Sequence, residues 1–171
     1  YYRAAVETAH AAGLKVESEA GGPGPPIHQV PVDALLAQGA VDSVRGEFWP
    51  DRMTLPAIWV VKETASAAHI YGKKRVHMQA FTTPVHWLEG PQDLKASADR
   101  AFAEGMNHVV WHTSAHQPPE AGKPGWVYFA GTHLNQNLPW WPMAKPFLSY
   151  LARASFLLQQ GLPVSDVLYY Y

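Results

Sequence analysis

The sequence predicts an α/β fold of the (β/α)8 barrel type, present as an incomplete barrel of about five βα units. Helix-like and strand-like segments alternate along the 171 residues. Four strand-like runs end at polar residues, Glu19, Glu47, Gln79 and His112, at steps of 28, 32 and 33 residues, which is the length of one βα unit. Parallel strands with right-handed crossovers collect such residues at one edge. We therefore expect the four side chains at one barrel mouth.

The expected helices carry apolar residues at helical spacing, as Leu94, Ala98 and Phe102 do within one of them. Each is followed by a glycine, which suits a helix C-terminus. The helices are Tyr2–Ala12, Pro31–Gln38, Ala57–Tyr71, Pro91–Glu104 and Pro146–Gln160. The expected strands are Leu14–Glu19, Val41–Glu47, Arg75–Ala80, Met106–Trp111 and Val164–Tyr171.

A complete barrel of this type needs roughly 250 residues. We therefore expect residues 1–171 to be part of one catalytic barrel domain, with the rest of the barrel and any accessory β domains outside them. The alternative is an open doubly wound sheet. No Gly-x-Gly-x-x-Gly turn follows a strand, and carboxylate, amide and imidazole groups at the strand ends suit a sugar better than a phosphate. The barrel is favoured.

Composition excludes several functional classes. Hydrophobic residues make up 47% of the chain and aromatic residues 12%, which is too much for a disordered protein. Thirteen Lys and Arg residues against fourteen Asp and Glu residues leave a net charge of -1, so no basic field favours nucleic acid or an anionic membrane. The chain has no cysteine, and therefore no thiolate metal site. Nucleic acid and membranes are therefore not expected partners, and the polar groups at the strand ends favour a carbohydrate.

Glu47 is followed by two aromatic residues, Phe48 and Trp49, that can offer apolar faces to a pyranose ring. The alternative for Glu47 is a structural ion pair with Arg45 or Arg52. On the preceding strand, we expect only one of two glutamates, at positions 17 and 19, to face the barrel interior. Glu19, nearer the turn, is favoured.

Two histidines follow the fourth strand, His112 and His116. Their spacing binds zinc on a helix, but these residues lie at a strand end and in a loop, without the His-Glu-x-x-His arrangement. We expect His112 to hydrogen-bond sugar hydroxyls and His116 to be structural. The metal ligands, if any, stay unknown.

The stretch "GTHLNQNLPWWPM" supplies the remaining candidate substrate-binding residues. Asn135 and Asn137 can donate to and accept from ring hydroxyls. Trp140 and Trp141 can stack on a sugar or close the barrel mouth. The alternative for at least one tryptophan is a core position at the start of a helix.

Several motifs in order resemble the catalytic barrel of the glycoside hydrolase family 106, the α-L-rhamnosidases. They are "VRGEFW", "SAAHIYGKKRVHMQAFTT", "DLKASADRAFAEGMNHVVWHTSAHQPP", "PGW…GTHLNQNLPWW" and "YLARASFLLQQGLPVSDVLYY". The resemblance implies the C-terminal portion of that barrel in a large, calcium-associated enzyme of glycoside breakdown that inverts the anomeric carbon. In that family the strand matching "VHMQAFTT" usually has a catalytic Glu where this chain has Gln79.

A glutamine amide cannot exchange a proton near neutral pH. Gln79 is therefore an engineered Glu-to-Gln change, a natural replacement whose role moved to Glu47 or Glu19 or was lost, or an ordinary polar strand end. The resemblance implies an inverting glycoside hydrolase acting on terminal α-L-rhamnosyl residues, and we expect Gln79, Glu47 and Glu19 at catalytic positions. The alternatives are a non-catalytic carbohydrate-binding relative and a retaining, β-galactosidase-like glycosidase that uses Glu19.

Overall fold

The sheet has four parallel strands in the order β1-β2-β3-β4. The computed structural model describes residues 1–20, 30–50 and 55–168. The strands are β1 (Glu17–Ser18), β2 (Ser43–Glu47), β3 (Val76–Ala80) and β4 (His108–Trp111). Each strand pairs with its successor in the chain, as consecutive βα units with one crossover hand do, whereas a doubly wound sheet reverses its strand order. The predicted α/β fold with a parallel sheet is confirmed, and its order is compatible with part of a barrel.

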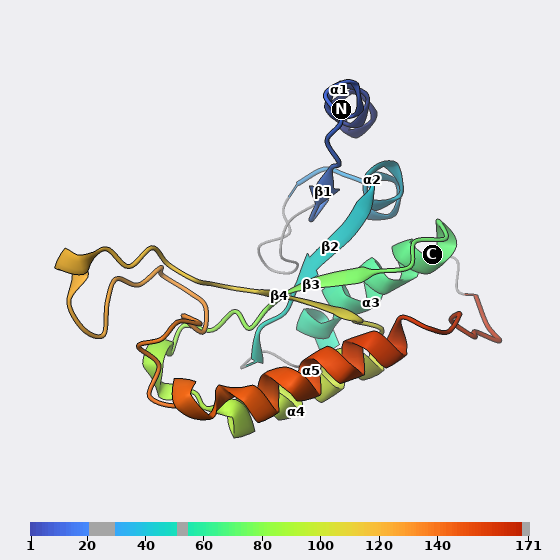
Figure 1. Ribbon diagram of the computed structural model, residues 1–171. Helices are drawn as coiled ribbons and strands as arrows, with labels where there is room; N and C mark the ends of the chain where they lie inside the picture. The colour runs from blue at the N-terminus through green and yellow to red at the C-terminus, as the bar shows by residue number, and fades with distance from the viewer. Residues whose placement is uncertain (21–29, 51–54, 169–171) are drawn as a thin grey trace.

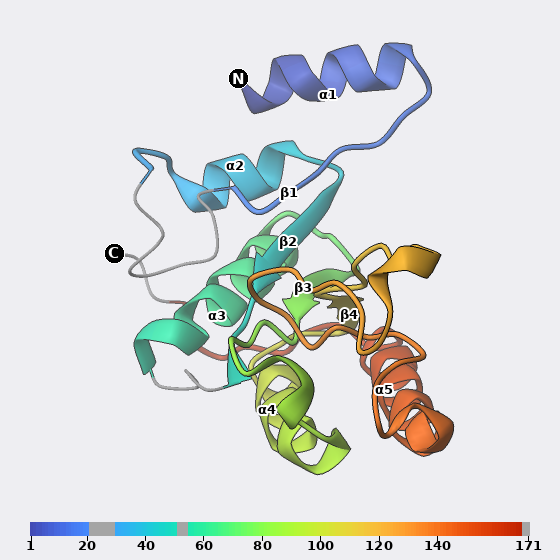
Figure 2. The same ribbon diagram turned by 90° about the vertical axis from the view of Figure 1, so that its left-hand side faces the viewer.

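Helices cover one face of this sheet (Figure 1). The α-helices are α1 (Tyr2–Ala11), α2 (Ala34–Ala40), α3 (Leu55–Ile70), α4 (Pro91–Ala103) and α5 (Ala144–Leu158). Short 3-10 helices are η2 (His86–Leu88), η3 (Pro119–Ala121) and η4 (Trp141–Met143). Figure 2 shows α2, α3, α4 and α5 in an arc around the strands, with α1 set apart. The arrangement leaves the other face of the sheet uncovered by these helices.

Local sequence explains where two of the helices begin. The Asp33 side chain accepts a hydrogen bond from the Leu36 amide at 2.9 Å, so α2 begins after this N-cap and not at Pro31. The helix also continues through Gly39, where an added Cβ would lie 2.4 Å from the Tyr71 ring. The predicted end at Gln38 is therefore wrong, because the glycine serves close packing and not termination.

The α4 helix follows its predicted boundaries closely. Pro91 is its first residue, and the Asp93 carboxylate accepts a hydrogen bond from the Gly90 amide at 2.9 Å. Both features are typical of a helix start. Its apolar stripe is buried, with Leu94 and Ala98 fully covered, as the spacing predicted.

The two faces of the sheet differ in chemistry. Val44, Val76 and Met78 are buried in one hydrophobic cluster with side chains of α3 and α4. Alternate residues of the same strands point to the opposite face, which carries Arg45 and His77 among others and is half-buried. The helix-covered face is therefore the core, and the other face is polar.

The expected fifth strand is wrong over residues 164–168, which form neither strand nor helix. The remaining part of that prediction, residues 169–171, lies outside the described residues. The first strand is also shorter than Leu14–Glu19, since only residues 17 and 18 pair with β2. Over the described ranges, no helix is long and apolar enough to cross a membrane.

Candidate functional site

The predicted strand ends meet at one edge of the sheet. Glu47 and Gln79 are direct Cα partners in the β2–β3 register. Glu19 follows β1 by one residue, and His112 follows β4 by one residue. Their assembly is confirmed, because parallel strands in sequential order bring successive carboxyl ends together. In an α/β barrel this edge is where chemistry is placed.

Arg45 links the two glutamates of the first strand. Its Nη1 lies 3.4 Å from Oε2 of Glu17, and its Nε lies 3.7 Å from Oε1 of Glu19. The expectation that only one of these glutamates faces inward is therefore wrong. Residues two apart on a strand share a face, so both carboxylates lie on the polar side. The other expected partner of Glu47, Arg52, lies outside the described residues.

His112 stands between Thr82 and Glu47. Its Nδ1 lies 3.0 Å from the Thr82 hydroxyl and 3.8 Å from Oε1 of Glu47. Burial, followed by the nearby charge of Arg45, lowers the pKa of His112 below its ordinary value. The imidazole is therefore neutral near pH 7 and can exchange hydrogen bonds with a sugar hydroxyl.

The pKa of Glu19 shifts in the opposite direction to that of His112. Burial raises the pKa of this carboxyl, Arg45 opposes that increase, and the charge of Glu17 adds to it. A carboxyl with a raised pKa holds its proton to higher pH, as a general acid requires. Glu47 is more deeply placed, with 6% of its surface exposed.

A second polar layer lies on the same face, further from the strand ends. His77 hydrogen-bonds Glu17, and its ring centroid lies 4.3 Å from that of His108. Burial, and secondarily the charge of His77, lowers the pKa of His108. The contact with His77 holds the Glu17 carboxylate in place. Arg45 then connects Glu17 to Glu19.

Gln79 is half-buried beside Glu47. Its backbone carbonyl accepts a hydrogen bond from the Phe48 amide at 3.1 Å. Its side-chain amide has no hydrogen-bond partner among the residues the structure describes. The amide is therefore available to a ligand, but it remains unable to transfer a proton.

The aromatic candidates separate by burial. Phe48 lies in the core with 1% of its surface exposed and packs edge-on against Phe81 at 5.3 Å, so it offers no face to a sugar. Trp140 is 8% exposed, and its indole donates to the Glu89 carbonyl at 2.9 Å. Trp141 is 38% exposed, and Trp49 is half-buried. Of the neighbouring tryptophans, Trp140 is the one in the core.

The two asparagines lie in the segment that returns from the long loop after β4. Asn135 accepts a hydrogen bond from the Asn137 amide at 2.8 Å through its side-chain oxygen. The Asn135 side-chain nitrogen is buried and has no protein partner within the described ranges. Asn137 is half-buried. Asn135 therefore keeps an unused donor.

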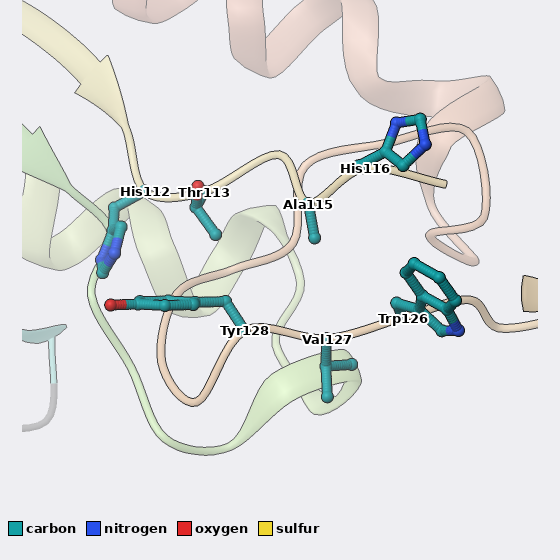
Figure 3. A pocket seen from close by; sticks show the side chains of 7 residues that line it. All are labelled: His112, Thr113, Ala115, His116, Trp126, Val127 and Tyr128. Atoms are coloured by element: carbon teal, nitrogen blue, oxygen red, sulfur yellow. The ribbon is translucent and has the colours of Figure 1, made fainter. Parts of the chain in front are cut away.

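A pocket of about 410 Å³ opens beside His112, and sequence reasoning missed most of it (Figure 3). It is lined by His112, Thr113, Ala115, His116, Trp126, Val127 and Tyr128. Of these lining residues, only His112 and His116 were named as candidates from the sequence. The available signal was the cluster of aromatic and apolar residues in "GWVYF" directly after Pro and Gly, which is unusual for a plain connection.

Metal binding gains no support from the described side chains. No group of three or more His, Cys, Asp or Glu residues there is arranged to hold a metal ion. Calcium takes six to eight oxygen ligands, and the described residues do not supply a carboxylate-rich set of that kind.

Comparisons with known proteins each give a glycosidase, although the names of the matched proteins differ. A family model described as alpha-L-rhamnosidase, Glyco_hydro_106, matches residues 1–171. The solved structure of a rhamnosidase from Novosphingobium sp. PP1Y superposes with a TM-score of 0.81 at 32% identity, over 94% of this chain and 16% of that one. A protein of Formosa agariphila named "Putative beta-glucuronidase" is 34% identical over 168 residues, 98% of this chain and 14% of the relative.

The chain thus spans only 14% and 16% of the lengths of these two relatives. Its agreement with the family extends over every described strand and helix, and the solved rhamnosidase shares both sequence and fold with it. The chain therefore belongs to the glycoside hydrolase family 106, the alpha-L-rhamnosidases.

Proposed function

We propose that residues 1–171 form part of the catalytic barrel of a glycoside hydrolase that removes terminal α-L-rhamnosyl residues. The observation that carries this proposal is the meeting of Glu19, Glu47, Gln79 and His112 at the carboxyl edge of one parallel sheet. The matched family and the solved rhamnosidase support the choice of sugar. Completion of the barrel by other parts of the protein belongs to the same proposal.

The proposed mechanism is inverting, with two carboxyl groups in different roles. The acid protonates the glycosidic oxygen while the base deprotonates a water that attacks the anomeric carbon. We assign the acid to Glu19, because its pKa is raised, and the base to Glu47. Glu19 lies beside Arg45, which is two residues before Glu47 on β2, so both carboxyl groups belong to the polar face of the sheet. Inversion needs carboxyl groups roughly 6.5–9.5 Å apart.

His112, Asn135, Asn137, Trp49 and Trp141 are proposed to hold the sugar. His112 is neutral and beside Glu47, and Asn135 has a donor available. Hydrogen bonds from such groups orient the ring hydroxyls. Trp140 is assigned to the core instead, because of its burial.

The experiment is hydrolysis of 4-nitrophenyl α-L-rhamnoside by the full-length protein, with 4-nitrophenyl β-D-glucuronide assayed in parallel because of the name of one relative. Proton NMR of the first-formed sugar distinguishes inversion from retention. We expect β-L-rhamnose first, and loss of that product in the Glu47→Gln variant. Retention of configuration would contradict the assigned mechanism.

A second candidate function is carbohydrate binding without catalysis, which the amide at position 79 favours. Calorimetric titration with L-rhamnose separates the two. Binding without turnover of either glycoside would establish this second function and exclude the first.

A further inference from the structure

The pocket beside His112 lies between two legs of the long loop that follows β4. The outgoing leg comprises residues 112–116 and the returning leg residues 126–128. The loop returns to the sheet through backbone hydrogen bonds: the Gly131 amide donates to Thr83 at 2.8 Å, and the Thr132 amide donates to His112 at 2.9 Å. The pocket is thus tied to the carboxyl ends of β3 and β4.

Gln117 holds the two legs at a defined distance. Its side-chain nitrogen donates to the Trp126 carbonyl at 2.7 Å, and its oxygen accepts from the Trp126 amide at 3.0 Å. Gly125 has a φ of +104°, and a Cβ there would lie 1.9 Å from the Gln117 oxygen. The loop therefore has one specific conformation that places Trp126 at the pocket.

Two exposed aromatic side chains on the returning leg line the pocket. Trp126 is 53% exposed and Tyr128 is 48% exposed. The Tyr128 ring lies edge-on to His112, with centroids 5.6 Å apart, and Figure 3 shows it extending toward that histidine. Single exposed aromatics are ordinary, but two aromatic rings and two imidazoles around about 410 Å³ match the size and make-up of a small-molecule site.

His112 is shared by this pocket and the proposed catalytic residues. Its Nδ1 approaches Thr82 and Glu47, and its ring also meets Tyr128. A glycoside has two parts joined by the oxygen that is cleaved. If the rhamnosyl part lies over Glu47, the part beyond that oxygen extends past His112 into the pocket.

We infer that this pocket is the site for the leaving group of the substrate. Its ligand is a ring with an apolar face and a polar edge, either a second pyranose or an aromatic aglycone. Trp126 and Tyr128 stack on the apolar face, and His116 with the tyrosine hydroxyl meets the polar edge. The inference rests on the proposed function.

The test compares wild-type full-length protein with Trp126→Ala on two substrates, 4-nitrophenyl α-L-rhamnoside and an α-L-rhamnosyl-D-glucose disaccharide. Free L-rhamnose serves as a competitive inhibitor that reports only on the rhamnosyl site. We expect kcat/KM to fall about 10-fold to 100-fold, with the inhibition constant of L-rhamnose changed less than about twofold. A loss on the aryl substrate alone identifies an aromatic leaving group, and a loss on the disaccharide alone identifies a sugar.

Trp59→Ala is the matched control, because Trp59 is a 43% exposed tryptophan on α3 that hydrogen-bonds Glu63. It should leave both kcat/KM values unchanged. Tyr128→Phe, which keeps the ring, should retain most of the activity that Tyr128→Ala loses. Unchanged kcat/KM in Trp126→Ala on both substrates, or an equal weakening of L-rhamnose inhibition, overturns the inference.

Failure of the proposed function gives a different result. If the wild-type protein hydrolyses neither rhamnoside, titration with phenyl β-D-glucoside, followed by tryptophan fluorescence, decides whether the pocket binds a ring. Quenching in the wild type that is absent from Trp126→Ala supports a ring-binding site there. Saturable quenching that persists in Trp126→Ala, or no quenching at all, overturns it.

Discussion

Gln79 lies where a catalytic carboxylate would neighbour Glu47, since the two residues are register partners at the ends of β2 and β3. Replacing Gln79 by Glu changes the shape little and adds a group that can exchange a proton. Glu19 and Glu47 already supply the acid and the base in the proposed mechanism, so we expect Gln79→Glu to change kcat on 4-nitrophenyl α-L-rhamnoside by less than about tenfold. Measurement of kcat across the pH range checks this. An increase of about 10²-fold to 10⁴-fold, with a new limb in the pH–rate profile, would place a missing catalytic carboxylate at position 79 and contradict the assignment of the proton transfers.

The pKa of Glu19, which burial raises, leads to a prediction about the pH dependence of activity. An acid catalyst works in its protonated form, so activity is present at pH values below the folded-state pKa and is lost as the pH rises through it. We expect the basic limb of kcat/KM to lie above the ordinary glutamate pKa of 4.5, and Glu19→Gln to remove it. Stopped assays across the pH range measure both profiles.

A variant of Arg45 tests the same assignment, because the charge of Arg45 opposes the increase in the Glu19 pKa. Arg45→Met should therefore move the basic limb to still higher pH. Lys15→Met, which removes a cation that does not shift the Glu19 pKa, is the control and should leave the limb in place. A limb that moves to lower pH in Arg45→Met would contradict the assignment.

At the scale of elements, the start of α5 places two adjacent tryptophans in different environments. Trp140 packs against Phe147 and donates to the Glu89 carbonyl, whereas Trp141 is 38% exposed. Trp140→Ala should lower the free energy of unfolding by about 3–5 kcal/mol. Trp141→Ala should change it by less than about 0.5 kcal/mol while weakening substrate binding. Denaturant unfolding and KM measurements check the pair, and equal stability losses would place both in the core.

The loop that returns to β4 depends on Gly131. This residue has a φ of +109°, and an added Cβ would lie 2.5 Å from the His112 carbonyl oxygen. Gly131→Ala should therefore displace His112 and lower kcat/KM about 10-fold or more, because small displacements of positioned groups reduce rates strongly. Gly161→Ala is the control, since a Cβ there meets open space. Equal activity of the two variants would show that the loop accommodates the change.

At the scale of the whole molecule, the sheet separates stability from chemistry. One face packs under α3 and α4 around Met78, which is fully buried. Met78→Ala should destabilise the α/β fold by about 2–5 kcal/mol and leave the pH–rate profile unchanged. Val110→Ala, at a half-buried position opposite Gln79 in the β3–β4 register, should cost less. Calorimetry of the full-length protein gives both values, and a larger loss for Val110→Ala would contradict this division of faces.

The sequence by itself determined the parallel α/β fold and the edge that carries the site. The spacing of Glu19, Glu47, Gln79 and His112 follows from the length of one βα unit, and this regularity is local enough to be visible in one chain. The apolar period predicted α4 for the same reason.

Tertiary structure decided which side chains are partners and which are covered. Phe48 and Trp49 look equivalent in the sequence, yet Phe48 is buried against Phe81, 33 positions later. Gly39, within α2, lies against the ring of Tyr71, the residue that directly follows α3. The pocket exists because residues 112–116 and 126–128 return to one place. Periodicity reports the environment along one element, whereas burial, ion pairs and pockets are properties of segments that only folding brings together.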